Sequence, residues 1–206
     1  MIEKIAFYQN RTDDTPNVEL AEVLAKKRNE KGLQEIVNGL HDDNKDVVND
    51  CIKVLYEVGY RNPDYIEPYV HEFLAGLKSR NNRLIWGSCI ALSLIADKKS
   101  DELYKEIDLI KKIYESGTVI TTDNCISIFS GIIKGNSKYE KSIFPILMKH
   151  IENCRPKEVA QHAERISICI NGKNSKKFIE ILSSRMETLS DAQAKRVKKV
   201  IDSIEK

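Results

Sequence analysis

Apolar residues recur along this chain at intervals of 37 positions. Three apolar series keep this interval, and their members are Leu33, Val70, Ile107, Phe144 and Ile181; Leu55, Leu92, Phe129 and Ile166; and Val58, Ile95, Ile132 and Cys169. A polar series in the same register holds only residues that turn the chain or cap a helix, namely Asp42, Ser79, Ser116, Asn153 and Ser190. Several matching series in one register indicate an internal structural repeat.

The apolar spacing within one unit is helical. Four residues at i, i+4, i+8 and i+11 form one stripe, which consists of Val47, Cys51, Leu55 and Val58. A second stripe precedes it and consists of Leu33, Ile36, Val37 and Leu40. Each unit is therefore predicted to be helix A, a short turn and helix B. The predicted A/B pairs are 30–41/44–59, 63–78/81–96, 100–116/119–134, 137–153/156–171 and 174–187/190–205.

The segment before the first pair is predicted to hold one further helix, near residues 18–28. Asn17, which follows Pro16, is the expected N-cap of this helix, and residues 12–16 are expected to be a loop. One helix pair cannot cover its own apolar stripe, but stacked neighbours share a continuous core.

We therefore expect one all-α domain over residues 1–206. It would consist of an N-terminal segment with a capping helix (1–29), four regular repeats (30–171) and a C-terminal capping repeat (172–206).

The pattern at the start of each B helix resembles the HEAT-repeat (armadillo-like α-solenoid) family. It reads Leu40-x-Asp42-x4-Val47-x3-Cys51-x3-Leu55 in the first pair and recurs in the next two. Pro68 and Pro145 interrupt two A helices, where a proline should bend them. The basic residue that commonly follows the valine is missing, because these positions hold Val48, Ile85, Thr122 and Val159. The resemblance implies a right-handed α-α superhelix of about five helix pairs. It also implies a partner-binding function, because HEAT-repeat proteins mostly bind partners.

Composition excludes several classes of protein. The chain is 41% hydrophobic and 31% charged, with a net charge of +2, which is typical of a folded globular protein that charge alone does not assign to nucleic acid. No apolar run approaches the ~18 residues of a membrane span, and the first residues do not resemble a signal peptide. We therefore expect a cytoplasmic protein without membrane contact.

No catalytic, cofactor or metal motif is evident. The five cysteines lack metal-ligand spacing, and Cys51 and Cys125 are expected to be buried packing residues at the repeat position that His162 also occupies. No partner residue for His162 can be assigned from the sequence. The other three histidines, His41, His71 and His150, are expected at the surface.

Charge is unevenly distributed between the ends. Residues 1–60 hold eight basic and twelve acidic residues, whereas residues 171–206 hold nine basic and five acidic ones. The C-terminal basic cluster consists of Lys173, Lys176, Lys177, Arg185, Lys195, Arg196, Lys198 and Lys199. It would either bind an acidic protein surface or a phosphate backbone, or keep the terminal repeat soluble.

In HEAT-like proteins the B helices line the concave surface, so their polar and aromatic positions are the candidates for partner binding. These candidates are Trp86, Asn49, Asp50, Asp123, Asn124, Gln161 and Arg165. Trp86 is the chain's single tryptophan, and it would either anchor a partner or fill a gap beside Gly87. The polar row would be either a binding groove or an ordinary solvated helix face.

Three functions remain open from the sequence. The leading hypothesis is a non-enzymatic scaffold that binds a protein or peptide on its concave face. The alternative is a DNA-binding or DNA-glycosylase-like HEAT-repeat protein acting on alkylated bases, in which Asp123 would supply the carboxylate near Trp86. A third is a structural subunit of a larger assembly. The oligomeric state and the identity of the partner do not follow from the sequence.

Overall fold

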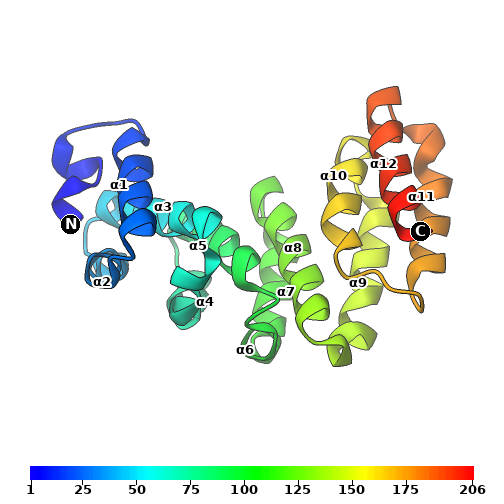
Figure 1. Cartoon of the computed structure of the whole chain (residues 1–206), viewed down its shortest axis with the longest axis horizontal. Coiled ribbons are helices and arrows are strands. Elements are labelled where there is room, and N and C mark those ends of the chain that lie inside the picture. The colour runs from blue at the N-terminus through cyan, green and yellow to red at the C-terminus, as the bar shows by residue number, and fades with distance from the viewer.

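A computed structural model describes all residues from 1 to 206, and all of its regular secondary structure is helical, without strands. The helices form an arch in which the two termini lie at opposite ends (Figure 1). The N-terminal segment holds two short 3-10 turns, Ile2–Lys4 and Phe7–Gln9, followed by helix α1 (Thr15–Lys27). No helix is both long enough and apolar enough to cross a membrane.

Five helix pairs follow α1. Their bounds are α2 (Glu30–Asn38) with α3 (Lys45–Arg61), α4 (Val70–Gly76) with α5 (Asn82–Ile95), α6 (Ser100–Lys105) and α7 (Ile107–Ser116) with α8 (Val119–Gly135), α9 (Glu140–Asn153) with α10 (Pro156–Ser167), and α11 (Ser175–Arg185) with α12 (Asp191–Ile204). The first four B helices start 37 residues apart, and the fifth starts 35 residues after the fourth. The B helices lie on the inner side of the arch and the A helices on the outer side (Figure 1).

One continuous core runs through the stack. It contains 47 buried apolar residues, from Ile5 near the N-terminus to Val200 in α12. The series that begins at Leu55 is fully buried in all four units, because it faces the A helix of its own pair and the neighbouring B helices. Hydrophobic burial shared between units is therefore what holds the arch together.

The polar repeat positions end the A helices and shape the turns. Asp42 and Ser79 accept hydrogen bonds from the backbone N–H groups of Asn44 and Asn81, at 2.8 and 3.0 Å. Those two asparagines are the N-caps of α3 and α5. In the last pair, Ser190 itself is the N-cap of α12, in a capping box with Gln193.

Two local predictions were wrong. Helix α1 begins at Thr15, with Asp14 as its N-cap, so Asn17 lies inside the helix and is fully buried. The Asn17 amide instead accepts a hydrogen bond from the N–H of Ala6, which holds the N-terminal segment against α1. Pro68 does not bend a continuous A helix, because it lies in a separate 3-10 turn ahead of α4. Pro145 does lie inside α9.

Candidate functional site

Trp86 lies half-buried on the inner face, where α3 and α5 meet. It lines a hollow of about 210 Å³, together with the apolar side chains Ile52, Tyr56, Ile90 and Ile120. The two helices approach closely here because Gly87 has no side chain, and a Cβ at that position would lie 2.3 Å from Cγ1 of Ile52. Trp86 therefore packs beside Gly87 and also presents part of its indole to the hollow.

An acidic hollow of about 480 Å³ adjoins the first one. The two share Asp14, Asn49 and Arg83 as lining residues. The charged residues that line it are four aspartates and two arginines, namely Asp13, Asp14, Asp46, Asp50, Arg11 and Arg83. Hydrogen bonds from Thr15 and Arg11 lower the pKa of Asp13 to about 2. The hollow is therefore net negative.

Asn49 and Asp50 are both engaged within the chain. The Oδ1 atom of Asn49 accepts a hydrogen bond from the Asn81 amide at 2.9 Å, which joins α3 to the cap of α5. The carboxylate of Asp50 accepts hydrogen bonds from the N–H of Phe7 at 2.7 Å and the amide of Asn17 at 2.8 Å. Asp50 thus fixes the N-terminal segment to α3 while it contributes negative charge to the acidic hollow.

Asp123 is the centre of a polar cluster further along the inner face, between α8 and α10. Its Oδ2 atom accepts a hydrogen bond from the Gln161 amide at 3.0 Å. Its backbone carbonyl accepts one from the guanidinium of Arg165 at 2.9 Å, and the same Arg165 nitrogen binds Ser127 Oγ at 2.7 Å. The structure therefore brings three of the sequence candidates together, because equivalent positions of adjacent B helices lie side by side.

A buried chain of hydrogen bonds leads from Asp123 through the core to the outer side. The Nε2 atom of His162 lies 2.8 Å from Asp123 Oδ1, and its Nδ1 atom lies 2.8 Å from Nε2 of His150. The Nδ1 atom of His150 lies 2.8 Å from the hydroxyl of Tyr114. Because a carboxylate only accepts, His162 donates from Nε2. With both rings neutral, His150 then donates to His162, and Tyr114 donates to His150.

His150 is a correction to the sequence analysis, which placed it at the surface. Only 9% of His150 is exposed, since α9 turns this side chain towards α10. Burial, and then the charge of His162, lower the pKa of His150 to about 4. His162 is 1% exposed, and its partner Asp123 lies 39 residues earlier in the chain. The i,i+12 spacing of the two histidines is no helical signal, so only the fold shows that they meet.

Cys154 lies beside the two imidazoles, at the end of α9. One ligand atom of each residue, the Cys154 sulfur and one nitrogen from each of His150 and His162, all lie within 4.8 Å of one another. Burial raises the pKa of the Cys154 thiol to about 11. A cleft of about 460 Å³ reaches Cys154 and His150 from the outer side. No metal-ligating cluster was expected from the sequence. This arrangement was missed because His162, its third member, comes from the next helix.

The remaining cysteines and Asn124 serve packing. The amide of Asn124 donates to the carbonyl of Ile120 at 2.8 Å, within α8. Cys51 and Cys125 are fully buried, as expected from the repeat. A hydrogen bond to Cys89 and burial raise the pKa of Cys125 far above its usual value. Cys89 on α5 is thus a neighbour of Cys125, one unit away.

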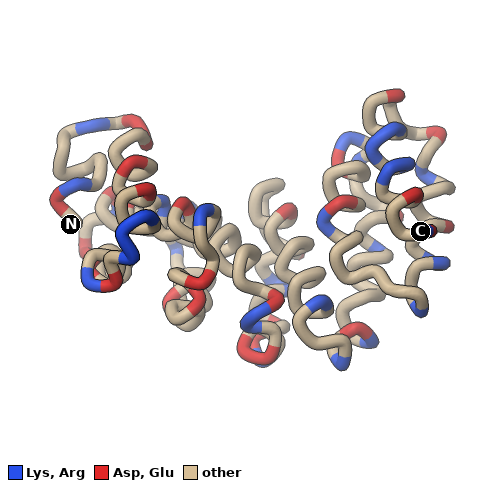
Figure 2. Tube along the Cα trace, viewed as in Figure 1, with Lys and Arg blue, Asp and Glu red and all other residues tan.

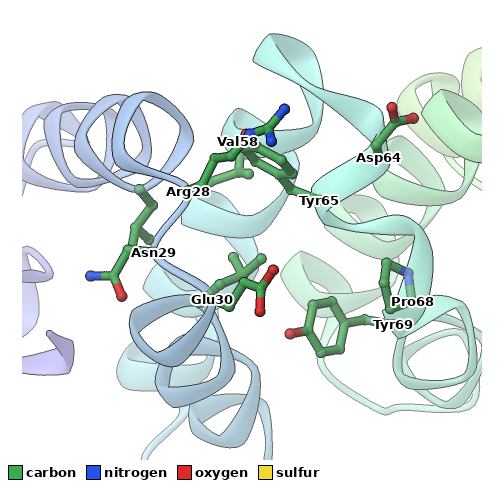
Figure 3. Close-up of a pocket in the computed structure, with 10 residues that line it drawn as sticks. Arg28, Asn29, Glu30, Val58, Asp64, Tyr65, Pro68 and Tyr69 are labelled. Atoms are coloured by element: carbon green, nitrogen blue, oxygen red, sulfur yellow. The ribbon is translucent and has the colours of Figure 1, made fainter.

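A further hollow lies away from the inner-face candidates, where the α1–α2 turn meets the segment between α3 and α4 (Figure 3). Its volume is about 280 Å³, and the Arg28 guanidinium donates to the hydroxyl of Tyr65 at 2.8 Å across it. None of its lining residues was among the partner-binding candidates from the sequence, and Leu33, Val58 and Pro68 were expected only as structural positions of the repeat.

Basic residues gather on the last helices, and several mark the course of α12 in Figure 2. Two members of the C-terminal basic cluster are engaged within the chain. The guanidinium of Arg196 makes two hydrogen bonds to the carboxylate of Glu164, at 2.8 and 2.6 Å. The guanidinium of Arg185 binds the carbonyls of Ile151, Glu152 and Cys154 at the end of α9. These arginines hold the terminal pair on the stack.

Comparison with known proteins identifies the architecture. No protein-family model and no curated protein matches the sequence. Among solved structures, an engineered protein aligns at a TM-score of 0.71 and 15% identity, over 99% of this chain and 96% of that one. The chain has the fold of an armadillo/HEAT-like repeat solenoid.

Two designed proteins lead to the same conclusion. A designed armadillo repeat protein in complex with peptide (KR)4 aligns at a TM-score of 0.66 and 12% identity, over 91% of this chain and 92% of that one. A computationally designed armadillo repeat protein for modular peptide recognition aligns at 0.67 and 13%, over 92% of each chain. At these identities the likeness concerns the fold alone, and it supports the all-α solenoid expected from the repeat.

Proposed function

We propose that this protein is a non-enzymatic scaffold that binds a peptide segment of a partner protein on its concave face. The observation that carries the proposal is the half-buried Trp86 in a partly apolar hollow, which Lys53 and Arg83 also line, directly beside an acidic one. A tryptophan at the centre of an apolar pocket with a polar rim is the usual composition of a binding hot spot. The designed solenoid that holds peptide (KR)4 supports the same use of this fold.

The lining residues indicate the chemistry of the partner. Ile52, Tyr56 and Ile90 would pack around one bulky apolar side chain laid against Trp86. Asp46 and the neighbouring aspartates of the second hollow would attract a Lys or Arg side chain of the same segment. The preferred ligand is therefore an extended segment in which a basic residue adjoins a bulky apolar one.

The far end of the inner face would contribute less to binding. There the Gln161 amide already donates to the carboxylate of Asp123, and the Arg165 guanidinium already donates to the backbone carbonyl of Asp123 and to Ser127. Exchanging such internal hydrogen bonds for bonds to a ligand yields little net free energy. We therefore place the main binding site between α3 and α5, and not along the whole arch.

The alternative of DNA binding or glycosylase-like chemistry finds little support on the inner face. Both carboxylate oxygens of Asp123 are occupied, by His162 and Gln161. The hollow beside Trp86 has two basic lining residues, Lys53 and Arg83, and the hollow that adjoins it holds four aspartates. Phosphate binding needs Lys and Arg in that place. Binding of duplex DNA at low salt, measured by fluorescence anisotropy, would revive this alternative.

The single tryptophan makes the proposal directly testable. A (KR)4 peptide and an analogue with a central leucine are titrated into the full chain while Trp86 emission is recorded. We expect the leucine analogue to bind more tightly and to shift the emission, because only it fills the apolar hollow. Trp86→Ala, followed by calorimetry, should weaken binding of the analogue by roughly 30-fold, the effect of a hot-spot residue.

The acidic hollow is tested with a matched pair of charge variants. Asp46→Asn should weaken both peptides several-fold and reduce the salt dependence of binding. Asp108→Asn removes an equivalent charge from the outer helix α7, where the side chain is 95% exposed, and should leave binding unchanged. Equal affinity of wild type and Trp86→Ala for the leucine analogue would refute the proposed site.

A further inference from the structure

The buried histidine pair of the fourth helix pair has the composition of a metal site. His150 lies in the last turn of α9, and Cys154 is the residue that caps this helix four positions later, while His162 faces them from α10. The three potential ligand atoms lie within 4.8 Å of one another. The three preceding helix pairs carry no histidine at the two matching positions, which hold Gly39 and Cys51, Gly76 and Ser88, and Ile113 and Cys125.

We propose that His150, Cys154 and His162 bind a divalent transition-metal ion of the zinc class. Two imidazoles and one thiolate form a nitrogen and sulfur ligand set, which selects Zn²⁺ or Co²⁺ and not the oxygen-seeking Mg²⁺ or Ca²⁺. The proposal concerns a site on the outer side of the solenoid and does not depend on peptide binding to the inner face.

The outer nitrogen of each imidazole already has the partner that a metal ligand needs. Nε2 of His162 is 2.8 Å from the carboxylate of Asp123, and Nδ1 of His150 is 2.8 Å from the hydroxyl of Tyr114. A metal-bound histidine almost always donates its other N–H to such a group, and this orients the ring. The inner nitrogens, Nε2 of His150 and Nδ1 of His162, consequently point at one another.

The two imidazoles require only a small adjustment, whereas the sulfur, which lies within 4.8 Å of them, must approach by up to about 1 Å to reach the ~3.6 Å between nitrogen and sulfur at a tetrahedral Zn²⁺. The inner nitrogens are 2.8 Å apart, whereas two nitrogens bound to one tetrahedral Zn²⁺ at ~2.0–2.1 Å lie about 3.3 Å apart. The rings must therefore separate by roughly half an ångström. His150 lines the outer cleft and can move in that direction, while the carbonyls that end α9 are held by Arg185.

The proton balance of binding is simple. The proton that His150 donates from Nε2 moves to Nδ1, where it is donated to the Tyr114 hydroxyl, so Nε2 becomes free to bind the metal. His162 already carries its proton on Nε2 and offers Nδ1. The Cys154 thiol releases one proton to solvent as the metal–sulfur bond forms, so binding releases one proton and should strengthen as pH rises.

The cleft supplies a route and a fourth position. It is about 460 Å³ in volume and is lined by His150, Cys154 and Tyr114, with Lys111 and Lys149 among its remaining residues. Three protein ligands leave one coordination position for water from the cleft, which distinguishes the site from a closed structural zinc site with four protein ligands.

The test uses Co²⁺ as a spectroscopic probe on the full chain after treatment with a chelator. We expect one equivalent to bind with the visible bands of tetrahedral Co²⁺ and a sulfur-to-metal charge-transfer band, and Zn²⁺ to displace it. Cys154→Ser should abolish the charge-transfer band and weaken binding by roughly 100-fold or more, whereas Cys169→Ser, outside the cluster, should change neither. Asp123→Asn should weaken binding by about 10- to 100-fold because it releases His162.

Two results would overturn the proposal. One is Co²⁺ binding to the wild type without the sulfur band. The other is equal affinity in wild type and Cys154→Ser, with both shown to be folded by circular dichroism, which would mean an adventitious ion only. Cys154 is only half-buried, so this variant remains informative even where His162→Gln fails to fold.

Discussion

The second and fourth helix pairs place different side chains at the same two positions of the repeat. In the second pair, Gly76 of α4 meets Ser88 of α5, and the Ser88 hydroxyl is a buried group without a hydrogen-bond partner. In the fourth pair, His150 of α9 meets His162 of α10, and every ring nitrogen has a partner at 2.8 Å. The solenoid therefore accepts either a tight contact or a polar one at this position.

The difference shows what a repeat constrains. Burial of the apolar stripe requires only that no space is left between helix A and helix B of a pair. Gly76 and Ser88 meet this requirement with small side chains, because the two helices then approach closely. Two histidines meet it with larger side chains, but they need Tyr114 and Asp123 from the preceding unit to satisfy their outer nitrogens. Special chemistry in one unit thus depends on its neighbour.

The largest expected effect is the loss of the polar contact. His162→Ala leaves Asp123 and His150 without their shared partner and opens a cavity, so we expect unfolding to become easier by about 3–5 kcal/mol. Cys125→Ala at the same repeat position of the preceding pair should cost only about 1 kcal/mol, because it removes one buried sulfur. Urea unfolding measures both, and equal losses would contradict the role given to the hydrogen-bond chain.

Next in size is the pH dependence that His150 contributes in the fourth pair. The pKa of His150 is lowered from its usual 6.5 to about 4, so the folded state keeps this ring neutral while the unfolded chain binds a proton. The stabilisation is therefore present above pH 6.5 and lost as pH falls towards 4, by up to about 3 kcal/mol. Nearby Glu158 and Asp123 act in the opposite direction and are smaller influences.

Unfolding curves recorded with a chelator between those pH values would show this loss. His150→Gln should flatten the profile, because glutamine does not titrate. A wild-type profile that is already flat would argue that His150 is protonated in the folded protein.

Overpacking of the second pair is expected to be intermediate. A Cβ added by Gly76→Ala would lie 2.2 Å from the Ser88 hydroxyl oxygen, so the helices must shift, at a cost of about 1–3 kcal/mol. The double variant with Ser88→Ala removes that oxygen and should recover most of the loss. Chemical denaturation of the single and double variants measures the coupling, and strict additivity would mean that the clash does not exist.

The smallest expected effect has the opposite sign. Ser88→Ala removes a buried hydroxyl that has no partner, so stability should remain unchanged or rise by up to about 1 kcal/mol. His162→Ala, at the same repeat position, is expected to lose stability. Measuring both variants is therefore the most direct test of the difference between the second and fourth helix pairs. A thermal melt in which Ser88→Ala is clearly destabilised would indicate a hydrogen bond that the structure does not contain.

The arrangement of helices was predictable, because burial follows a simple period. The five pairs follow from the recurrence of apolar residues, and the B helices start within one residue of the predicted positions. The wrong prediction for the start of α1 also has a physical reason. Pro16 and Asn17 are compatible with the first turn of a helix as well as with its boundary, so the sequence did not decide whether α1 begins after Asp14 or after Asn17.

The site was predictable only in part. The repeat register placed Trp86 and Asn49 on one face, and both line the same hollow in the structure. The pairing of Asp123 with His162 and of His162 with His150 was not predictable, since each joins residues from different helices at spacings without periodic meaning. The contacts of Gln161 and Arg165 with Asp123 likewise result only from the lateral packing of α10 on α8.

The sequence by itself determined that this protein is an all-α stack of helix pairs, because apolar stripes that recur at a constant interval are buried when successive helix pairs stack side by side. The tertiary structure alone decided which polar side chains meet across that stack. Such contacts depend on the rotation of each helix and on small residues such as Gly87, which sets how closely α3 and α5 approach. A shift of a fraction of an ångström separates a hydrogen bond from none, and periodicity carries no information at that scale.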